Sequence, residues 1–285
     1  GKTAVPVHIS EISLDEQDRT PTGFGELDRV LGSGIVKGSL VLVGGDPGIG
    51  KSTLLLQVCR NLAGAGKRVL YISGEESLKQ IKMRANRIGV ITGELLFLCE
   101  TNLDTIHGAI ERSKPDIVII DSIQTMYSNQ LDSAPGSVSQ VRMCGNQLMK
   151  LGKTKNLPIF IVAHVTKSGD LAGPKTVEHL VDCVLNFTGE RDQELRVMRA
   201  YKNRFGTTSE IGAFRMEAEG LIEVRDISAS FLENREDKTQ GSVTTAIYEG
   251  SRPVMFEMQA LVSPANVGFA RRTAVGVDNT RLNMI

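Results

Sequence analysis

The sequence predicts an α/β fold in which a mostly parallel central sheet carries helices on both faces. The main observation is that short apolar runs alternate with amphipathic stretches of helical length between about residue 40 and residue 165. A second observation is that some runs, such as residues 117–120, are apolar at every position, as in strands that are buried on both faces. After about residue 180 the helical patterns cease and short strand patterns follow, which predicts hairpins that extend the sheet.

The first segment, residues 1–21, is polar and mixed, and Pro6 and Pro21 interrupt it, so we expect a loosely held arm. A helix is expected at residues 22–31, because Thr22 is a suitable N-cap and the apolar residues after it fall on one helical face. The glycines that follow are expected to end this helix and to turn the chain.

Strands and helices then alternate along the chain. Buried strands are expected at residues 40–43, 69–72, 95–98, 117–120 and 159–162. Helices are expected between them, at residues 52–62, 78–88, 103–112 and 138–155. Short strands follow at residues 184–187, 195–201, 212–216 and 221–224. This succession predicts parallel strands first and hairpins afterwards.

The remaining sequence predicts a boundary and the start of a further domain. Residues 228–250 are polar and contain a charged cluster, which is typical of a loop, and residues 254–262 show one more strand pattern. This last segment is too short to close a hydrophobic core of its own. We therefore divide the chain into an arm at 1–21, a main domain at 22–227, and a linker with the opening of another domain at 228–285.

The composition argues against several classes of protein. Lys and Arg total 33, as do Asp and Glu, so the formal net charge of zero does not support wholesale electrostatic capture of nucleic acid, although a local basic stripe stays open. The 4 cysteines lack C-x-x-C spacing, which argues against a zinc module and predicts reduced thiols. There is no apolar run of the ~18 residues that cross a bilayer and no leader, so we expect a cytoplasmic protein without a membrane partner.

A glycine-rich loop between the first buried strand and the next helix fits the pattern G-x-x-x-x-G-K-[ST]. Glycines let the backbone wrap a phosphate with inward N–H groups, and the helix that begins at the loop adds the positive end of its dipole. Lys51 would supply a mobile charge for the β- and γ-phosphates, and the Ser52 hydroxyl a ligand for Mg²⁺. The predicted site for ATP and Mg²⁺ comprises Gly45, Asp46, Pro47, Gly48, Ile49, Gly50, Lys51, Ser52 and Thr53.

Carboxylates at two strand ends complete the predicted site. Asp121 follows a buried apolar run and would reach the magnesium ion from the carboxyl end of its strand, although an Asp in this position also commonly caps a turn. Glu75 and Glu76 follow another strand, and one of them would activate the attacking water. We favour Glu75; the alternative is that both glutamates simply enrich the first turn of the next helix.

Together these residues resemble the RecA/KaiC/DnaB group of ATPases. The stretches that carry the resemblance are residues 22–31, the phosphate loop, residues 74–77 and residues 121–124. Two further stretches narrow it to the bacterial RadA (Sms) family: the sequence K-N-R-F-G at 202–206, and residues 171–175 with Glu178 and His179. The resemblance covers nearly the whole chain from about Arg19 onward, and K-N-R-F-G is its most specific part.

The resemblance implies a RecA-like P-loop ATPase core with a β-hairpin extension, followed by the start of a truncated C-terminal domain similar to the Lon protease fold. It also implies a DnaB-type helicase or branch-migration ATPase that acts in homologous recombination and DNA repair as a hexameric ring. The implied partners are single-stranded DNA, branched recombination intermediates and a recombinase. The family's four-cysteine zinc module is absent from this sequence, so we expect a trimmed chain.

The resemblance also implies roles for single residues beyond the phosphate loop. Glu75 matches the general base, and His164 matches a sensor of the γ-phosphate at a strand end. Lys202 and Arg204 match cationic fingers that one subunit offers to its neighbour's nucleotide, where charge spreads over the phosphoryl oxygens in the transition state. Without the resemblance, His164 is equally well interpreted as a core histidine, and the two basic residues as solvated side chains.

DNA contacts are expected in two loops at the carboxyl edge of the sheet, residues 122–140 and 166–175. Lys167 and Lys175 in the second loop would grip phosphates without reading bases, and the alternative is a pair of ordinary solvated loops. Two other functions stay open. One is a KaiC-like kinase, for which no sequence feature marks an acceptor, and the other is a nucleotide-gated ring scaffold without translocation. DNA-stimulated hydrolysis would distinguish the motor from the scaffold.

Overall fold

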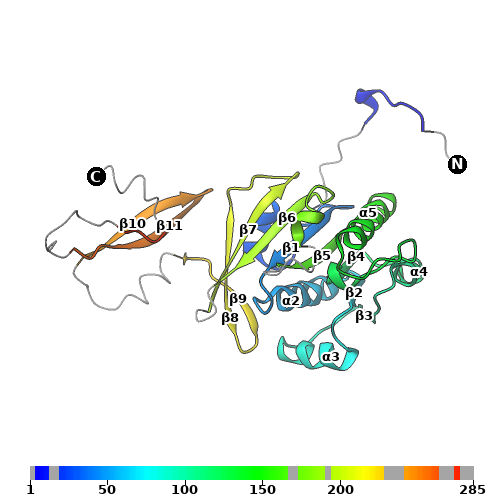
Figure 1. The fold of residues 1–285 in the computed structure, drawn as a ribbon, viewed down its shortest axis with the longest axis horizontal. Helices are drawn as coiled ribbons and strands as arrows, with labels where there is room; N and C mark the ends of the chain where they lie inside the picture. The colour runs from blue at the N-terminus through cyan, green and yellow to red at the C-terminus, as the bar shows by residue number, and fades with distance from the viewer. Residues whose placement is uncertain are drawn as a thin grey trace.

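The computed structural model describes residues 4–12, 19–165, 173–189, 194–227, 241–262 and 273–276. Its main body is a 9-stranded sheet in the order β3-β2-β4-β5-β1-β6-β7-β8-β9, and β10 and β11 form a separate 2-stranded sheet. Figure 1 shows this orange hairpin beside the main body, beyond β7 and β8 and away from α3, α4 and α5. The predicted α/β class is confirmed.

The helices and strands have the following bounds. The α-helices are α1 (Gly25–Leu31), α2 (Lys51–Gly64), α3 (Leu78–Arg87), α4 (Leu103–Ser113) and α5 (Val138–Lys155). Short 3-10 helices are η1 (Ile9–Glu11), η2 (Ile123–Thr125) and η3 (Pro174–Thr176). The strands are β1 (Leu40–Gly45), β2 (Val69–Ser73), β3 (Leu95–Cys99), β4 (Ile117–Asp121), β5 (Ile159–His164), β6 (Cys183–Thr188), β7 (Leu195–Asn203), β8 (Ile211–Glu217), β9 (Gly220–Glu223), β10 (Ser242–Glu249) and β11 (Arg252–Gln259).

The sheet has a parallel part and an antiparallel part. Strand β1 pairs in parallel with β5 on one side and β6 on the other, and β2, β3 and β4 continue the parallel part. From β6 to β9 the strands are antiparallel and follow one another as hairpins. The predicted hairpin extension is therefore confirmed, and the carboxyl ends of all the parallel strands lie at one edge of the sheet.

Successive residues of the parallel strands face opposite layers of helices. In β1, Val41 and Val43 belong to the core cluster that contains residues of α1, α2 and α3. Leu40 and Leu42 belong to the second cluster, which contains residues of α4 and α5. This alternation explains why the strand runs are apolar at every position. The parallel strands are therefore held between two layers of helices.

Two sequence predictions were wrong. Residues 242–249 were predicted as part of a polar loop, but they form β10 and pair with β11. Most residues of β10 are at least partly exposed, so no burial period marks the strand in the sequence. Thr22 does not cap α1, whose N-cap is Phe24 without a side-chain bond. The Thr22 hydroxyl donates instead to Asp28 Oδ1 at 2.7 Å and accepts from the Phe24 backbone N–H at 3.2 Å.

The arm is fastened near its end. Thr20 forms a β-bridge with Ile35, and Arg19 Nη2 donates to the Phe205 carbonyl at 2.9 Å. Nearer the start, apolar side chains such as Val5 are exposed. All 4 cysteines carry free thiols, which are buried except at Cys99. Within the described ranges, no helix combines the length and apolar character that a membrane span requires.

Residues at the turn of the β10–β11 hairpin fasten it to the main sheet. Arg252 is buried, and its Nη1 lies 2.5 Å from Glu26 Oε1 in α1. The same guanidinium donates to the Val224 carbonyl at 3.1 Å. Nearby, Arg199 Nη1 in β7 pairs with Glu249 Oε2 at 2.9 Å. These contacts join the segment after residue 227 to the sheet that carries the site.

Candidate active site

The side chains predicted to act on the nucleotide converge on the carboxyl edge of the parallel strands. The phosphate loop follows β1, Glu75 follows β2, Asp121 ends β4 and His164 ends β5. These strands are neighbours in the sheet, in the order β2-β4-β5-β1 (Figure 1). Single ligand atoms of Glu75, Asp121 and His164 all lie within 4.8 Å of one another. Residues that are far apart in the sequence therefore face one common space.

The phosphate loop has a backbone that requires its glycines. Gly45, Gly48 and Gly50 have φ angles of 155°, 79° and 116°, in the region that favours glycine. A Cβ at Gly45 would lie 2.5 Å from the Phe187 carbonyl oxygen, so a side chain there would displace β6. Helix α2 begins directly after Gly50, and its first N–H groups have no helical acceptor. This arrangement is suited to binding phosphate oxygens.

Lys51 is buried and folds over its own loop. Its Nζ donates to the Gly45 carbonyl at 2.6 Å and to the Asp46 carbonyl at 2.8 Å. Burial lowers the pKa of Lys51 to about 8, against the opposing effect of the Asp121 and Asp46 carboxylates. A phosphate would supply charged acceptors, which bind an ammonium more strongly than neutral carbonyls do.

The two carboxylate oxygens of Asp121 differ in their hydrogen bonding. Oδ2 accepts from Ser52 Oγ at 2.6 Å and from the Tyr71 hydroxyl at 2.5 Å. Oδ1 is buried and has no hydrogen-bond partner among the described residues, which is unusual for a charged atom. Hydroxyl and carboxylate oxygens are the ligands that Mg²⁺ takes at nucleotide phosphates. Ser52 and Asp121 therefore fit a Mg²⁺ ion, and Tyr71 fixes the orientation of the carboxylate.

Glu75 is held by two hydrogen bonds. Its Oε1 lies 2.8 Å from His164 Nε2 and accepts from Ser122 Oγ at 2.7 Å. The hydrogen bond from His164 lowers the pKa of Glu75, and the bond from Ser122 acts in the same direction against partial burial. The carboxyl group is therefore ionised near neutral pH, as a general base must be.

The neighbouring Glu76 has a different partner. Its Oε1 lies 2.6 Å from Arg84 Nη2 in α3. Burial raises the pKa of Glu76, and Arg84 partly offsets this. The N-cap of α3 is Ser77, with a complete capping box, so neither glutamate lies within the first turn of that helix. Glu76 is thus engaged in an ion pair, whereas Glu75 faces the phosphate loop and the end of β5.

Lys202 and Arg204 lie at the opposite edge of the sheet. Lys202 lies at the end of β7 and Arg204 directly follows it, and this end of β7 pairs with the start of β6 at Cys183. Gly45 of the phosphate loop pairs instead with Phe187 near the end of β6. At about 3.3 Å per residue, these two positions are roughly 13 Å apart along the strand. The structure therefore does not bring Lys202 and Arg204 to the phosphate loop of their own chain.

The two predicted DNA loops differ in what the structure describes. Lys175 is exposed in η3, beside Pro174, which approaches Gly44 of β1 near the carboxyl edge. Lys167 lies outside the described residues. The other loop, residues 122–140, is held from within, because the buried Gln140 donates to the Ser133 carbonyl at 2.8 Å. Only Lys175 of the two predicted lysines can therefore be placed.

Three side chains that support the site were not predicted from the sequence. Besides Tyr71 and Ser122, Arg196 in β7 is buried, and its Nε donates to the Ile49 carbonyl of the phosphate loop at 3.0 Å. A tyrosine or an arginine within an apolar strand pattern needs a buried partner, and this signal could have identified Tyr71 and Arg196. Ser122 gives no comparable signal, because a serine after a strand end is common in turns.

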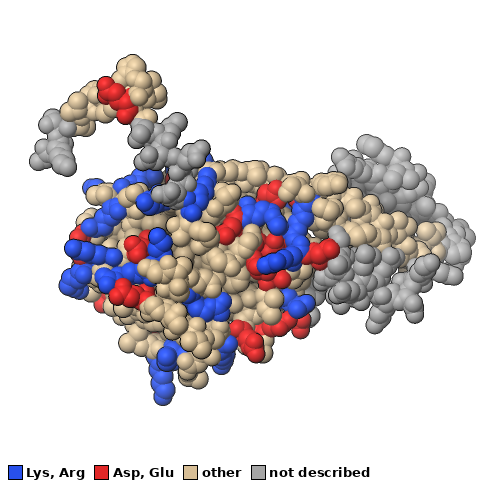
Figure 2. Space-filling view, turned by 180° about the vertical axis from the view of Figure 1, so that it is seen from behind, with Lys and Arg blue, Asp and Glu red and all other residues tan. Residues whose placement is uncertain are grey.

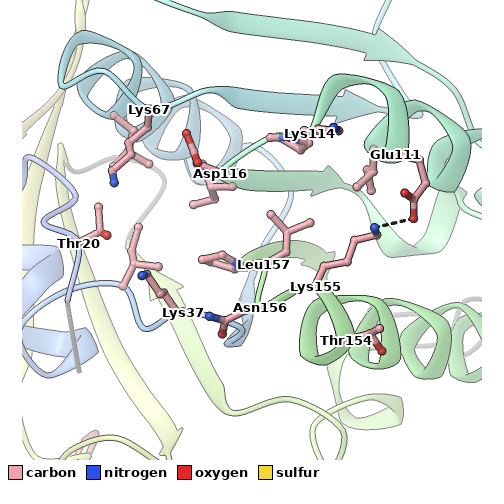
Figure 3. Close-up of a pocket in the computed structure, with 16 residues that line it drawn as sticks. Thr20, Lys37, Lys67, Glu111, Lys114, Asp116, Thr154, Lys155, Asn156 and Leu157 are labelled. Atoms are coloured by element: carbon pink, nitrogen blue, oxygen red, sulfur yellow. Dashed lines mark ion pairs between the residues drawn. The ribbon is translucent and has the colours of Figure 1, made fainter. Parts of the chain in front are cut away.

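A cavity of about 560 Å³ lies at the amino edge of the sheet, beside the residues that precede β2, β4 and β5. The lysines around it in Figure 3 are Lys37, Lys67, Lys114 and Lys155. Three of them lie at or just after the C-termini of α2, α4 and α5, whose partial negative charge they offset. Lys155 also pairs with Glu111 at 2.6 Å. Figure 2 shows basic side chains interspersed with acidic ones on the rear face. Three of the four lysines around the cavity thus have a structural role at a helix end, so we assign no ligand to this cavity.

Comparisons with known proteins identify relatives of this chain. A family model described as an AAA domain matches residues 19–170. The chain is 54% identical over 280 residues to the DNA repair protein RadA of Bacillus subtilis (strain 168), covering 98% of this chain and 61% of that protein. It is 52% identical over 285 residues to the DNA repair protein RadA of Streptococcus pneumoniae (strain ATCC BAA-255 / R6), covering 100% of this chain and 68% of that protein. The chain therefore spans less than two thirds of the first of these relatives.

Among solved structures, a KaiC-like protein from the hyperthermophilic archaeon Pyrococcus horikoshii OT3 has a TM-score of 0.59 to this chain. The match covers 73% of this chain and 99% of that protein, at 16% sequence identity. At this identity the likeness concerns the fold alone. It agrees with the fold that the phosphate loop and the strand-end carboxylates predict.

Proposed function

Because the chain belongs to the RadA family of DNA repair proteins, we propose that it hydrolyses ATP with Mg²⁺ and drives movement on DNA in recombination and repair. The proposal rests on the convergence of Lys51, Ser52, Asp121 and Glu75 at one edge of the sheet. Single-stranded and branched DNA substrates, a recombinase partner and a cytoplasmic setting are part of the proposal because of the family resemblance. The relatives are longer than this chain, so their activity is proposed for it, not transferred.

The proposed reaction uses groups that already point at one another. Lys51 would exchange its bonds to the Gly45 and Asp46 carbonyls for bonds to phosphate oxygens. Ser52 and Asp121 would hold Mg²⁺, which neutralises phosphate charge when it is bound. Glu75 would accept the proton of the attacking water. His164 now bonds to Glu75, and we assign it to sensing the γ-phosphate, because its ring lies at the end of the strand next to β1.

We assign Lys202 and Arg204 to the nucleotide of a neighbouring subunit. Their place at the edge opposite the phosphate loop supports action in trans. Cations near the γ-phosphoryl group stabilise the charge of the transition state, and a finger supplied in trans is worth roughly 10³–10⁵ in rate. Hydrolysis would then depend on assembly into a ring, which we propose to be a hexamer.

The first test measures ATP hydrolysis with and without single-stranded DNA, for the chain and for two variants. We expect DNA to raise turnover and Lys51→Ala to abolish it. The matched control, Lys79→Ala, changes an exposed lysine of α3 and should have no effect. If the rate of ATP hydrolysis is the same with and without DNA, the result would contradict the proposed DNA motor and favour the nucleotide-gated scaffold. Transfer of labelled phosphate to the protein would instead favour the KaiC-like kinase.

A mixing experiment tests action in trans. Lys51→Ala subunits lack a working phosphate loop but keep their fingers, whereas Arg204→Ala subunits keep the loop and lack one finger. Each variant alone should be inactive, and a mixture should regain part of the activity, because some interfaces then join an intact loop to an intact finger. Inactivity of every mixture would contradict the assignment, provided that both variants assemble like the parent chain.

The DNA loop has a separate test. The double variant Lys167→Ala/Lys175→Ala should bind single-stranded DNA more weakly and with a smaller dependence on salt, because two phosphate contacts are lost. Fluorescence anisotropy of a labelled oligonucleotide at several salt concentrations measures both quantities. Unchanged affinity and salt dependence would remove these lysines from the proposed DNA contact.

A further inference from the structure

A buried carboxylate holds the side chain of Arg204. Asp182 lies directly before β6 and is 3% exposed. Its Oδ2 accepts from the Leu40 backbone N–H at 2.8 Å, which fixes it to the start of β1. Its Oδ1 accepts from Arg204 Nη1 at 2.9 Å. A second cation, Lys153 Nζ in α5, lies 3.6 Å from the same Oδ1. Two cations therefore share one buried oxygen atom.

The two cations are tethered differently. The Arg204 backbone N–H donates to the Asp182 carbonyl at 2.9 Å, which anchors the backbone, whereas the side chain is 46% exposed and can turn outward. Lys153 stands in the last turn of α5, and its flexible side chain is 53% exposed. Burial, followed by the positive charge of Arg204, lowers the pKa of nearby Lys202. An outward turn of Arg204 toward an anion would relieve that repulsion.

We propose that Asp182 is a positioning residue that retains Arg204 while no neighbouring nucleotide is present, and that it exchanges Arg204 for Lys153 when Arg204 turns to the γ-phosphate. The inference rests on the proposed action of Arg204 in trans. A buried carboxylate that loses its counter-charge is strongly destabilised, so release of Arg204 alone would be opposed. Lys153 already lies within ion-pair distance of Asp182 and removes this opposition.

The test measures the rate of ATP hydrolysis per subunit in the assembled chain, together with its affinity for fluorescent ADP. Lys153→Met removes the replacement charge and should lower the maximal rate roughly 5- to 100-fold, the effect of leaving a buried charge unpaired. Affinity for ADP should not change, because Lys153 is remote from the phosphate loop. Lys153→Arg should restore the rate, and the control Lys150→Met, on the same helix, should leave it unchanged.

Repeating the Lys153→Met change in an Asp182→Asn chain separates the proposed exchange of Arg204 for Lys153 from other effects of Lys153. Asp182→Asn keeps an acceptor for the Leu40 N–H but removes the buried charge, so Lys153→Met should have little further effect in that background. If Lys153→Met lowers the rate equally in both backgrounds, the exchange is wrong. It is also wrong if Lys153→Met matches the parent chain while Arg204→Ala is inactive. If Arg204→Ala itself hydrolyses ATP normally, the action in trans fails, and this inference fails with it.

Discussion

The two edges of the sheet carry similar residue types, but they differ in how fully the polar groups are satisfied. At the carboxyl edge, Asp121 Oδ1 and His164 Nδ1 are buried without a hydrogen-bond partner among the described residues. At the amino edge, both carboxylate oxygens of Asp182 accept hydrogen bonds, and Glu111 pairs with Lys155. Buried polar groups are normally satisfied, so atoms that lack partners mark where a ligand belongs. Chemistry is therefore expected at the first edge, and support and control at the second.

The largest expected effect concerns which glutamate at the carboxyl edge, Glu75 or Glu76, acts as the general base. Glu75→Gln should lower the maximal rate of hydrolysis by roughly 10²- to 10⁴-fold, because a general base is lost. Binding of nucleotide should persist, since Glu75 is not part of the phosphate loop. Single-turnover hydrolysis and ADP titration measure the two quantities. The matched change is Glu76→Gln, next along the chain, which should lose far less; equal losses would contradict the assignment.

The next effect concerns the orientation of the Asp121 carboxylate. Tyr71→Phe removes a hydroxyl that donates to Asp121 Oδ2 at 2.5 Å. Hydrogen bonds to charged groups contribute about 1.5–3 kcal/mol, so we expect the magnesium-dependent part of ADP affinity to weaken by roughly 10-fold or more. Calorimetric titration with and without Mg²⁺ separates that part. Tyr248→Phe, on the exposed hairpin, is the control. Equal weakening without Mg²⁺ would show that Tyr71 supports the loop and not the metal ligand.

The smallest effect concerns the lysines of the amino edge. Lys67→Gln and Lys114→Gln should each lower the free energy of unfolding by about 0.3–1 kcal/mol, because they remove positive charge from helix C-termini. Urea unfolding at low and high salt measures this, and the loss should shrink at high salt. ATP hydrolysis should not change. A clear loss of ATP hydrolysis would contradict the distinction between the carboxyl and amino edges, because it would place a functional contact in the cavity at the amino edge.

The sequence predicts the functional side chains at the carboxyl edge of the sheet better than those at the amino edge. The phosphate loop and Asp121 are recognisable because their residue types follow from local chemistry at the end of a buried strand. The roles of Tyr71 and Asp182 depend on contacts between strands that are distant in sequence, and no local pattern specifies them. Strand β10 was missed for a related reason: its residues are largely exposed, so hydrophobic alternation does not mark it. The chemistry of a local motif is predictable, whereas side-chain contacts between distant strands and the pairing of largely exposed strands are not.

The contact between Arg252 and Glu26 has a practical consequence for anyone who shortens this chain. The predicted boundary at residue 228 suggests a minimal ATPase that ends at residue 227. Such a fragment would lack Arg252, which contacts the buried Glu26 Oε1 at 2.5 Å. Glu26 would keep its ion pair with Arg29 at 2.9 Å, so we expect a loss of stability below the roughly 3–5 kcal/mol that follows when a buried charge is left without any partner. A usable fragment should therefore extend through β11 to Gln259, or else carry a neutral residue in place of Glu26.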